Sequence, residues 1–470
     1  MTAGPPPLAD AAEPLGKLQR GLGSGYLWAL DAHRSVAHAL LVHCLFNDPR
    51  WDQQLDAREE YYATLALDIE LDLQSLEAWL RDNDEESAEL EQNVLGMLGR
   101  MAIRGNAEAS RVLRDYVAHG RSWQRAIALL TGDPEMMRAG VPWPEAVVGL
   151  DGVLVERFAG ESALAEALAD VDGRERPWSL WSIENHRIAG ALAAGHRVPL
   201  PPRTRRRQPR RKQPNPRELS TEALLGVTEE SRWRQIAEEL TTRRSRDDVR
   251  RMMGAARDPD SAMRRAAILA LANQGRRDVL EIAEESTSQE PRGKLQGTIA
   301  LALEAMPLSQ TRTLAHEWLT SPDWGRRRKA AGILGTRAEE QDLEGARRAL
   351  ARELDEGLAG DVFVICSLAE ALQRCARQGP FEELSRAYEQ IPYSYGRRFI
   401  VSALAASDPT FAGDLAVECL WDCELESRAI AAAFVDRRIR LASQRLAELA
   451  GDDAQAASVR LAASGPSANA

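Results

Sequence analysis

The chain has 470 residues, of which 44% are hydrophobic, 28% charged and only 5% aromatic, with a formal net charge of −11. This balance is typical of a folded helical protein and excludes a disordered or collagen-like chain. Five cysteines in so long a chain predict no disulfide framework, so we expect a reducing, cytoplasmic location. The sequence has neither a signal-peptide pattern nor an apolar run of about 20 residues, so we expect no membrane partner.

Residues 1–25 are rich in proline and glycine and are predicted to be a disordered N-terminal tail. Helical apolar periodicity begins near Tyr26 and continues, with breaks at glycine and proline, to about residue 197. We therefore predict a helical N-terminal arm over residues 26–197.

The composition changes abruptly over residues 198–217, where six prolines alternate with basic side chains. Proline and like charges both oppose helix formation, so this stretch is predicted to be an extended linker between two arms. Its basic side chains, which could contact a polyanion or an acidic partner, are Arg203, Arg205, Arg206, Arg207, Arg210, Arg211 and Lys212.

Helix pairs follow over residues 218–451, which we predict to be a C-terminal arm, and residues 452–470 are predicted to be a disordered tail. The first helices of the pairs are expected to begin near Ser261, Gly293, Asp323, Asp361, Tyr395 and Leu425. The second helices are expected to begin near Arg277, Gln310, Gln341, Phe381, Thr410 and Ile439.

Three stretches share one pattern, in which an alanine lies three residues before a glycine and an aliphatic residue seven before it. The glycines are Gly105, Gly275 and Gly379. The pattern predicts a helix that ends at a left-handed glycine and a second helix that folds back on the first. Because one such pair cannot bury its own apolar face, repeated pairs must stack, and the predicted fold is an all-α solenoid of antiparallel helix pairs.

The segment Asp258–Leu271 resembles the first helix of a HEAT repeat, with its Asp, Arg and alanine-rich apolar stripe. Ser321–Leu334 is similar but looser, and Tyr395–Ile400 lacks the leading Asp-Pro. Asp48–Tyr62 also resembles the front end of uncharacterised bacterial HEAT-repeat proteins. The resemblance implies a solenoid, and HEAT repeats usually imply protein–protein scaffolding, although a fold does not dictate a function.

Charge is distributed unevenly along the chain. Residues 1–202 carry a net −13, residues 203–265 a net +8 and residues 266–470 a net −6. The basic linker could contact an acidic groove of its own solenoid, act as a solvated spacer, or bind nucleic acid or another polyanion. No aromatic residue is interleaved with its arginines to stack on bases, which weakens the nucleic-acid interpretation.

Arginines and tryptophans within the helix pairs are the other candidate contacts. Paired arginines at the starts of first helices could line a groove, or they could pair with helix-start carboxylates and solvent. Trp178 and Trp181 could anchor a partner on the N-terminal arm, or they could belong to its core. The arginines in question are Arg264, Arg265, Arg327, Arg328, Arg397 and Arg398.

No residue pattern indicates catalysis, a metal or a cofactor. Cys419 and Cys423 could share a helix face, but no histidine lies near them, so they are interpreted as buried apolar side chains. Histidines five residues apart, such as His33 and His38, point in different directions on a helix. We therefore predict no catalytic, metal or cofactor-binding residues.

Three functions remain as hypotheses. The first is a non-enzymatic scaffold or adaptor, which binds a partner protein on solenoid surfaces. The second is a nucleic-acid-binding protein that uses the basic linker, including HEAT-like DNA-repair enzymes. The third is a HEAT-type lyase or a chaperone-like factor, for which the sequence singles out no residue. We expect the first.

Overall fold

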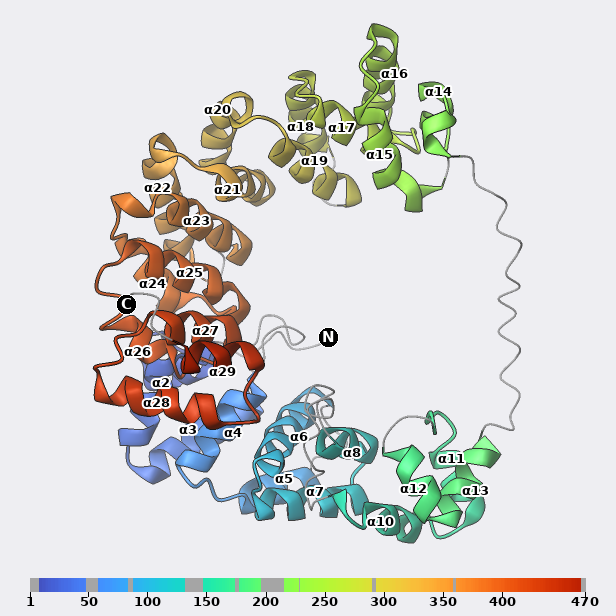
Figure 1. Ribbon diagram of the computed structural model, residues 1–470, viewed down its shortest axis with the longest axis vertical. Helices are drawn as coiled ribbons and strands as arrows, with labels where there is room; N and C mark the ends of the chain where they lie inside the picture. The colour runs from blue at the N-terminus through green and yellow to red at the C-terminus, as the bar shows by residue number, and fades with distance from the viewer. Residues whose placement is uncertain are drawn as a thin grey trace. The chain divides into compact units, whose positions relative to one another are not determined.

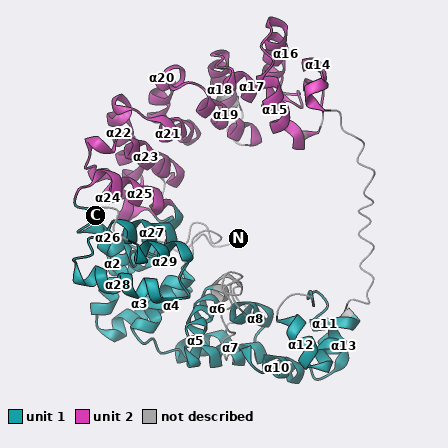
Figure 2. Cartoon of the chain, viewed as in Figure 1, with its two compact units in different colours: residues 1–207, 392–395, 410–470 teal, residues 208–391, 396–409 magenta. Residues whose placement is uncertain are grey.

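The computed structural model describes residues 8–47, 58–82, 88–131, 147–173, 177–195, 215–227, 229–289, 293–357 and 361–465. Every regular element in these ranges is a helix, which confirms the predicted all-α class for this part of the chain (Figure 1). The chain divides into two compact units, drawn in different colours in Figure 2. Unit 1 comprises residues 1–207, 392–395 and 410–470, and unit 2 comprises residues 208–391 and 396–409.

Unit 1 is built from helices at both ends of the sequence. Its N-terminal helices are α1 Pro14–Arg20, α2 Gly23–Asp31, α3 Arg34–Phe46, α4 Glu59–Asp68, α5 Gln74–Asp82, α6 Ala88–Ile103, α7 Ala107–His119 and α8 Trp123–Thr131. They continue with α10 Leu150–Arg157, α11 Glu161–Ala167, α12 Trp178–Glu184 and α13 His186–Gly195. Its C-terminal helices are α26 Leu415–Cys419, α27 Leu425–Phe434, α28 Arg440–Gly451 and α29 Ala457–Ser464.

Much of the predicted N-terminal tail is helical, which differs from the prediction of disorder over residues 1–25. Pro14 occupies the first turn of α1, where its missing N–H costs nothing, and Gly21 ends the helix with φ +67°. Leu18 and Leu22 are fully buried. Composition alone indicates disorder here, but a few well-spaced apolar side chains are enough to order the segment against α3.

The predicted C-terminal tail, 452–470, is also ordered as far as residue 465. Helix α29 packs on α27 and α28 and buries Val459 and Ala463. Arg437 donates hydrogen bonds to the carbonyls of Ala462 and Ala463, at 3.1 and 3.0 Å, and so satisfies the end of α29. The segment is part of the core of unit 1.

Specific contacts join the two ends of the sequence within unit 1. The Cys423 amide donates to the Gly21 carbonyl at 2.9 Å, and α2 contacts α26. Arg104 forms ion pairs with Glu60 and, at 2.9 Å, with Asp452. Residues 410–451, predicted to belong to the C-terminal arm, are therefore grouped with the N-terminal helices. The predicted linker at 198–217 lies outside the described residues except for 215–217.

Unit 2 contains the regular helix pairs. Its helices are α14 Thr221–Leu225, α15 Trp233–Thr241, α16 Arg246–Arg257, α17 Arg264–Asn273, α18 Asp278–Gln289, α19 Lys294–Ala305, α20 Leu308–Leu319, α21 Trp324–Arg337, α22 Leu343–Asp355, α23 Val362–Arg374, α24 Glu382–Gln390 and α25 Ser394–Ser407. Of the twelve predicted helix starts, all but that of α26 lie within three residues of the observed ones. Helix α25 begins at the boundary between the units.

The helices of unit 2 form two layers. We call α17, α19, α21, α23 and α25 the first helices, and α18, α20, α22 and α24 the second helices. Successive helices from α17 to α23 contact one another within the first layer, and α20, α22 and α24 do so within the second. Each second helix from α18 to α22 also contacts the first helix that follows it (Figure 1). This arrangement leaves one side of each first helix uncovered by the second layer, and it is compatible with an α-solenoid.

Two of the three predicted glycine caps are confirmed. Gly105 and Gly275 have φ values of +82° and +72°. Gly379 instead has φ −71° and an extended ψ, because a residue before proline is confined to extended backbone and Pro380 follows it. Another glycine matters for packing: a Cβ on Gly335 would lie 2.7 Å from the Ser367 carbonyl oxygen, so α21 and α23 approach closely only because this side chain is absent.

Candidate functional site

The predicted linker contacts, Arg203, Arg205, Arg206, Arg207, Arg210, Arg211 and Lys212, lie outside the described residues. The two candidate tryptophans lie in the core of unit 1. Trp178 and Trp181 are 8% and 3% exposed, and their rings meet edge to face at 5.2 Å. Trp123 completes the cluster with its ring 6.4 Å from that of Trp178. These indoles therefore stabilise unit 1 and do not line a groove.

Arg327 and Arg397, two of the predicted groove residues, are buried in unit 2. The Arg327 Nε lies 2.6 Å from the Oε1 of Glu353, a carboxylate with no solvent exposure. A second carboxylate, Glu356, lies 3.0 Å from the same guanidinium. Arg397 has no exposed surface. Both arginines point into the helix pairs, so they are not groove contacts.

Arg264 and Arg265 begin α17 and are half-buried. Arg264 donates to the Ala256 carbonyl at 3.1 Å and to the Ser286 hydroxyl at 3.2 Å, which links α17 to α16 and α18. Arg265 donates to the Thr298 hydroxyl at 2.8 Å on α19, and its guanidinium lies 4.2 Å from the centre of the Trp233 ring on α15. Arg264 therefore connects α17 to α16 and α18, whereas Arg265 connects it to α15 and α19.

Arg328 is the exposed member of the α21 pair. Its guanidinium lies 4.0 Å above the Phe363 ring on α23, an aromatic stack across two first helices. Arg398 lies 4.6 Å from the ring of its neighbour Phe399 on α25. Among the six predicted groove arginines, Arg265, Arg328 and Arg398 each lie over an aromatic ring of a first helix or of α15.

Exposed hydrophobic side chains gather on the same layer. Within the described part of unit 2, the large hydrophobic residues with substantial exposure are Leu301, Trp324 and Phe363, at 42%, 45% and 40%. They lie on α19, α21 and α23, three consecutive first helices. We name these three residues and Arg328 the first-helix patch. Of these four residues the sequence predicted only Arg328. Trp324 could also have been predicted, because it lies one helical turn before Arg328 and therefore shares its helix face.

Charge divides between the two layers. The five first helices carry eleven basic and two acidic side chains, whereas the four second helices carry five basic and eleven acidic ones. The basic residues of the first helices are Arg264, Arg265, Lys294, Arg326, Arg327, Arg328, Lys329, Arg337, Arg374, Arg397 and Arg398, and the acidic ones are Glu304 and Glu370. The preceding pair, α15 and α16, does not follow this division.

Arginines of the second helices are matched by carboxylates. Arg312 pairs with Asp342 at 3.0 Å, Arg347 with Glu383 at 2.9 Å and Arg386 with Asp355 at 2.7 Å. These pairs connect successive helix pairs along the second layer. Within the described residues, Arg328 forms no ion pair and contacts a ring instead. The arginines of the second layer are therefore paired with carboxylates, while the first layer presents cationic and apolar groups to solvent.

The two carboxylates of the first layer are both partly buried. Burial raises the pKa of Glu304, against a smaller opposing effect of Arg337. Burial likewise raises the pKa of Glu370, against the charges of Arg374 and Arg398. Both shifts are in the direction of the neutral form, as partial burial of a carboxylate produces.

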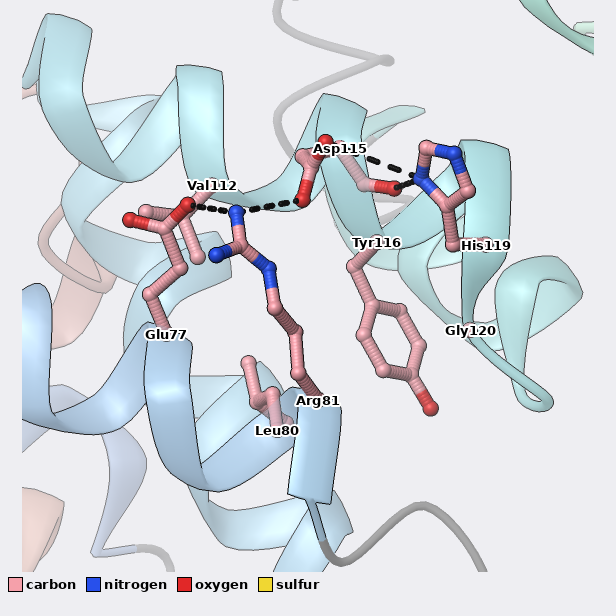
Figure 3. Close-up of a pocket in the computed structure, with 8 residues that line it drawn as sticks. All are labelled: Glu77, Leu80, Arg81, Val112, Asp115, Tyr116, His119 and Gly120. Carbon is pink, nitrogen blue, oxygen red and sulfur yellow. Dashed lines mark hydrogen bonds and ion pairs between the residues drawn. The ribbon is translucent and has the colours of Figure 1, made fainter.

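Unit 1 contains a pocket of about 240 Å³ between α5 and α7 (Figure 3). Arg81 lies between Glu77 and Asp115, with N–O distances of 2.6 and 3.2 Å. A hydrogen bond from Arg111 lowers the pKa of Glu77. The lining residues are Glu77, Leu80, Arg81, Val112, Asp115, Tyr116, His119 and Gly120. Because its charges pair with one another and it is smaller than most ligand sites, the pocket is a weaker candidate than the first-helix patch.

Cys423 has a polar environment that its sequence context does not reveal. Its sulfur lies 2.8 Å from the Nη1 of Arg58, which also donates to the Arg20 carbonyl at 2.8 Å. Cys423 and Cys419 are both buried, and all five cysteines are free thiols. The apolar interpretation suits the burial of Cys419, but Cys423 takes part in the polar contacts that join the chain ends in unit 1.

The described residues contain no cluster of three or more histidine, cysteine or acidic side chains placed to hold a metal ion. None of their helices combines the length and the apolar character that crossing a bilayer requires. Comparisons with protein-family models, with curated proteins and with solved structures find no match to this chain. The function must therefore be argued from the surfaces themselves.

Proposed function

We propose that the protein is a non-enzymatic scaffold or adaptor, a HEAT-like α-solenoid whose first-helix face in unit 2 binds a partner protein. The observation that carries this proposal is the exposure of Leu301, Trp324 and Phe363 on three consecutive helices. Exposed hydrophobic groups beside a stacked arginine are typical of protein interfaces, where aromatic and arginine side chains supply most of the binding energy. A cytoplasmic location is part of the proposal.

The test compares a patch variant with a matched control in affinity capture from the native host. The patch variant is Trp324→Ser with Phe363→Ser, and the control is Arg348→Ser, an exposed residue of the second helix α22. We expect a discrete protein that the wild type and the control retain after nuclease treatment and in high salt, and that the patch variant loses. Capture of the same proteins by all three chains would refute the role of this face.

A second candidate is a nucleic-acid-binding scaffold, which the seven basic residues within 203–212 favour. Its affinity should fall steeply with salt, because phosphate binding releases counterions. Replacing the arginines at 205, 206, 207, 210 and 211 with serine should abolish a gel shift, and an unchanged shift would refute the linker-driven version. The lyase or chaperone hypothesis gains no residue from the surfaces described above.

A further inference from the structure

The first-helix patch combines hydrophobic anchors with a free cationic edge. The guanidinium carbon of Arg328 lies 4.0 Å from the centre of the Phe363 ring, and Trp324 lies one helical turn before Arg328. Arg328 is exposed and forms no ion pair within the described residues, and a carboxylate matches the guanidinium fork with two parallel hydrogen bonds. The patch is therefore suited to a group that places a carboxylate beside an apolar side chain.

The charge of the first helices around the patch favours an occupant that carries negative charge. The first helices carry eleven basic and two acidic side chains, and eight of the basic ones remain at least partly exposed, since only Arg327, Lys329 and Arg397 are buried. Exposed or half-buried cations on the first helices α19, α23 and α25 include Lys294, Arg374 and Arg398. Complementary charge steers encounter and disfavours wrong partners, so this layer selects an acidic occupant.

The hydrophobic anchors favour a protein segment over nucleic acid. Stacking of successive bases requires several aromatic faces, but Leu301 offers none and Arg328 lies over the Phe363 ring, which leaves only the Trp324 indole in the patch. The acidic second layer and the net charge of −11 also repel a long phosphate backbone beyond this layer. Leucine, indole and phenyl groups instead match the apolar stripe of an amphipathic helix.

The dimensions set the length of that helix. Packed helices lie about 8–10 Å apart, so α19, α21 and α23 together span about 20 Å between axes. A helix rises 1.5 Å per residue, so about 13 residues reach across the three. We propose that the first-helix patch binds an acidic amphipathic helix of about four turns from a partner protein, with an apolar side chain among Leu301, Trp324 and Phe363 and a carboxylate on Arg328. This inference rests on the proposed scaffold function and names the chemistry of the partner.

The test selects binders from a phage-displayed library of random 16-residue peptides on the immobilised full-length protein. We expect the enriched peptides to combine an excess of Asp and Glu with aliphatic or aromatic residues at helical spacing. A synthetic enriched peptide, labelled with fluorescein, then gives affinities by anisotropy. We expect Trp324→Ser and Arg328→Gln each to weaken binding by about 10-fold or more, as for hot-spot and charge-assisted contacts.

The control is Arg348→Gln on α22, which removes an exposed arginine from the second layer and should leave the affinity unchanged. Circular dichroism of each variant checks that the helical fold is kept. Enrichment of neutral or basic peptides, of no peptides, or of peptides that bind the Trp324→Ser variant equally well would overturn the proposal. The proposal would also be overturned if the protein bound a labelled 30-mer oligonucleotide at physiological salt and the Arg328→Gln variant lost that binding. A folded partner captured through the same face would then still support the scaffold, so the two proposals can fail separately.

Discussion

The buried ion pair between Arg327 and Glu353 should be among the most sensitive positions of unit 2. Glu353 has no exposed surface, and its second oxygen accepts from the Asp361 amide at the start of α23 at 3.0 Å. Replacing Glu353 with leucine leaves a buried guanidinium without its nearest carboxylate. The attraction of two charges about 4 Å apart is about 4 kcal/mol at an effective dielectric constant of 20. Breaking a buried pair from one side costs about 3–5 kcal/mol in measured cases, and we expect a loss in this range.

Hydrogen exchange followed by mass spectrometry measures this loss locally, without requiring that both units unfold together. A loss of 3–5 kcal/mol corresponds to protection factors about 150- to 5,000-fold lower in α21 and α22. The double variant Arg327→Met with Glu353→Leu should recover most of the protection, because an apolar pair often replaces a buried ion pair at little cost. Glu344→Gln, which breaks an exposed pair with Arg348 on the same helix, should change protection by less than about 3-fold.

Two results would refute this reasoning. The first is a Glu353→Leu variant whose protection falls no further than that of Glu344→Gln. The second is a double variant whose loss equals the sum of the two single losses, since independent effects would mean that the pair contributes no coupling energy.

Three further predictions concern packing, charge and the chain end. Gly335→Ala should destabilise unit 2 by about 1–3 kcal/mol in thermal unfolding, because the added Cβ would lie 2.7 Å from the backbone of α23. Gly297→Ala is the control: its Cβ would enter open space, so it should stabilise unit 2 by about 0.5–1 kcal/mol. Equal effects of the two substitutions would contradict the close approach of α21 and α23. Glu304→Gln should raise the melting temperature at pH 7.5, since burial raises the native pKa above the unfolded value and the native state then gains stability as the pH falls. The advantage of that variant should shrink towards pH 4.5, and a constant difference would contradict the assignment. Deleting residues 452–470 should cost unit 1 about 3 kcal/mol through lost apolar burial and the lost partner of Arg104, and an unchanged melting curve would show the segment to be dispensable.

Helix starts in unit 2 could be predicted because their signals are local. Asp323, for example, lies immediately before the apolar periodicity of α21, and its carboxylate accepts from the Arg326 amide at 2.9 Å as an N-cap. Asp361 does the same for α23 by accepting from Phe363 at 2.8 Å. Such residues satisfy a helix end wherever the helix packs, so no knowledge of the neighbours is needed.

The surface chemistry could be predicted only in part, because it depends on what each helix packs against. Arg327 and Arg328 are adjacent and identical in sequence terms, yet one is buried against Glu353 and the other is exposed on Phe363. The contact between the two ends of the sequence could not be predicted either, because Arg58 and Cys423 are 365 residues apart. Composition misjudged the tails because buried area, rather than proline or serine content, decides whether a short segment is ordered.

The discontinuity of unit 1 has a consequence for synthesis. Helices α1 to α4 leave the ribosome early, but Cys423, which contacts Gly21 and Arg58, lies in the part of unit 1 that begins at residue 410. At about 5–20 residues per second, translation separates the two halves of this interface by about 20–80 s. During that interval unit 2 emerges in full and can fold, while Arg58 and Arg104 still lack their C-terminal partners, Cys423 and Asp452. Unit 2, in the middle of the sequence, can therefore finish folding before unit 1, which contains the N-terminal helices.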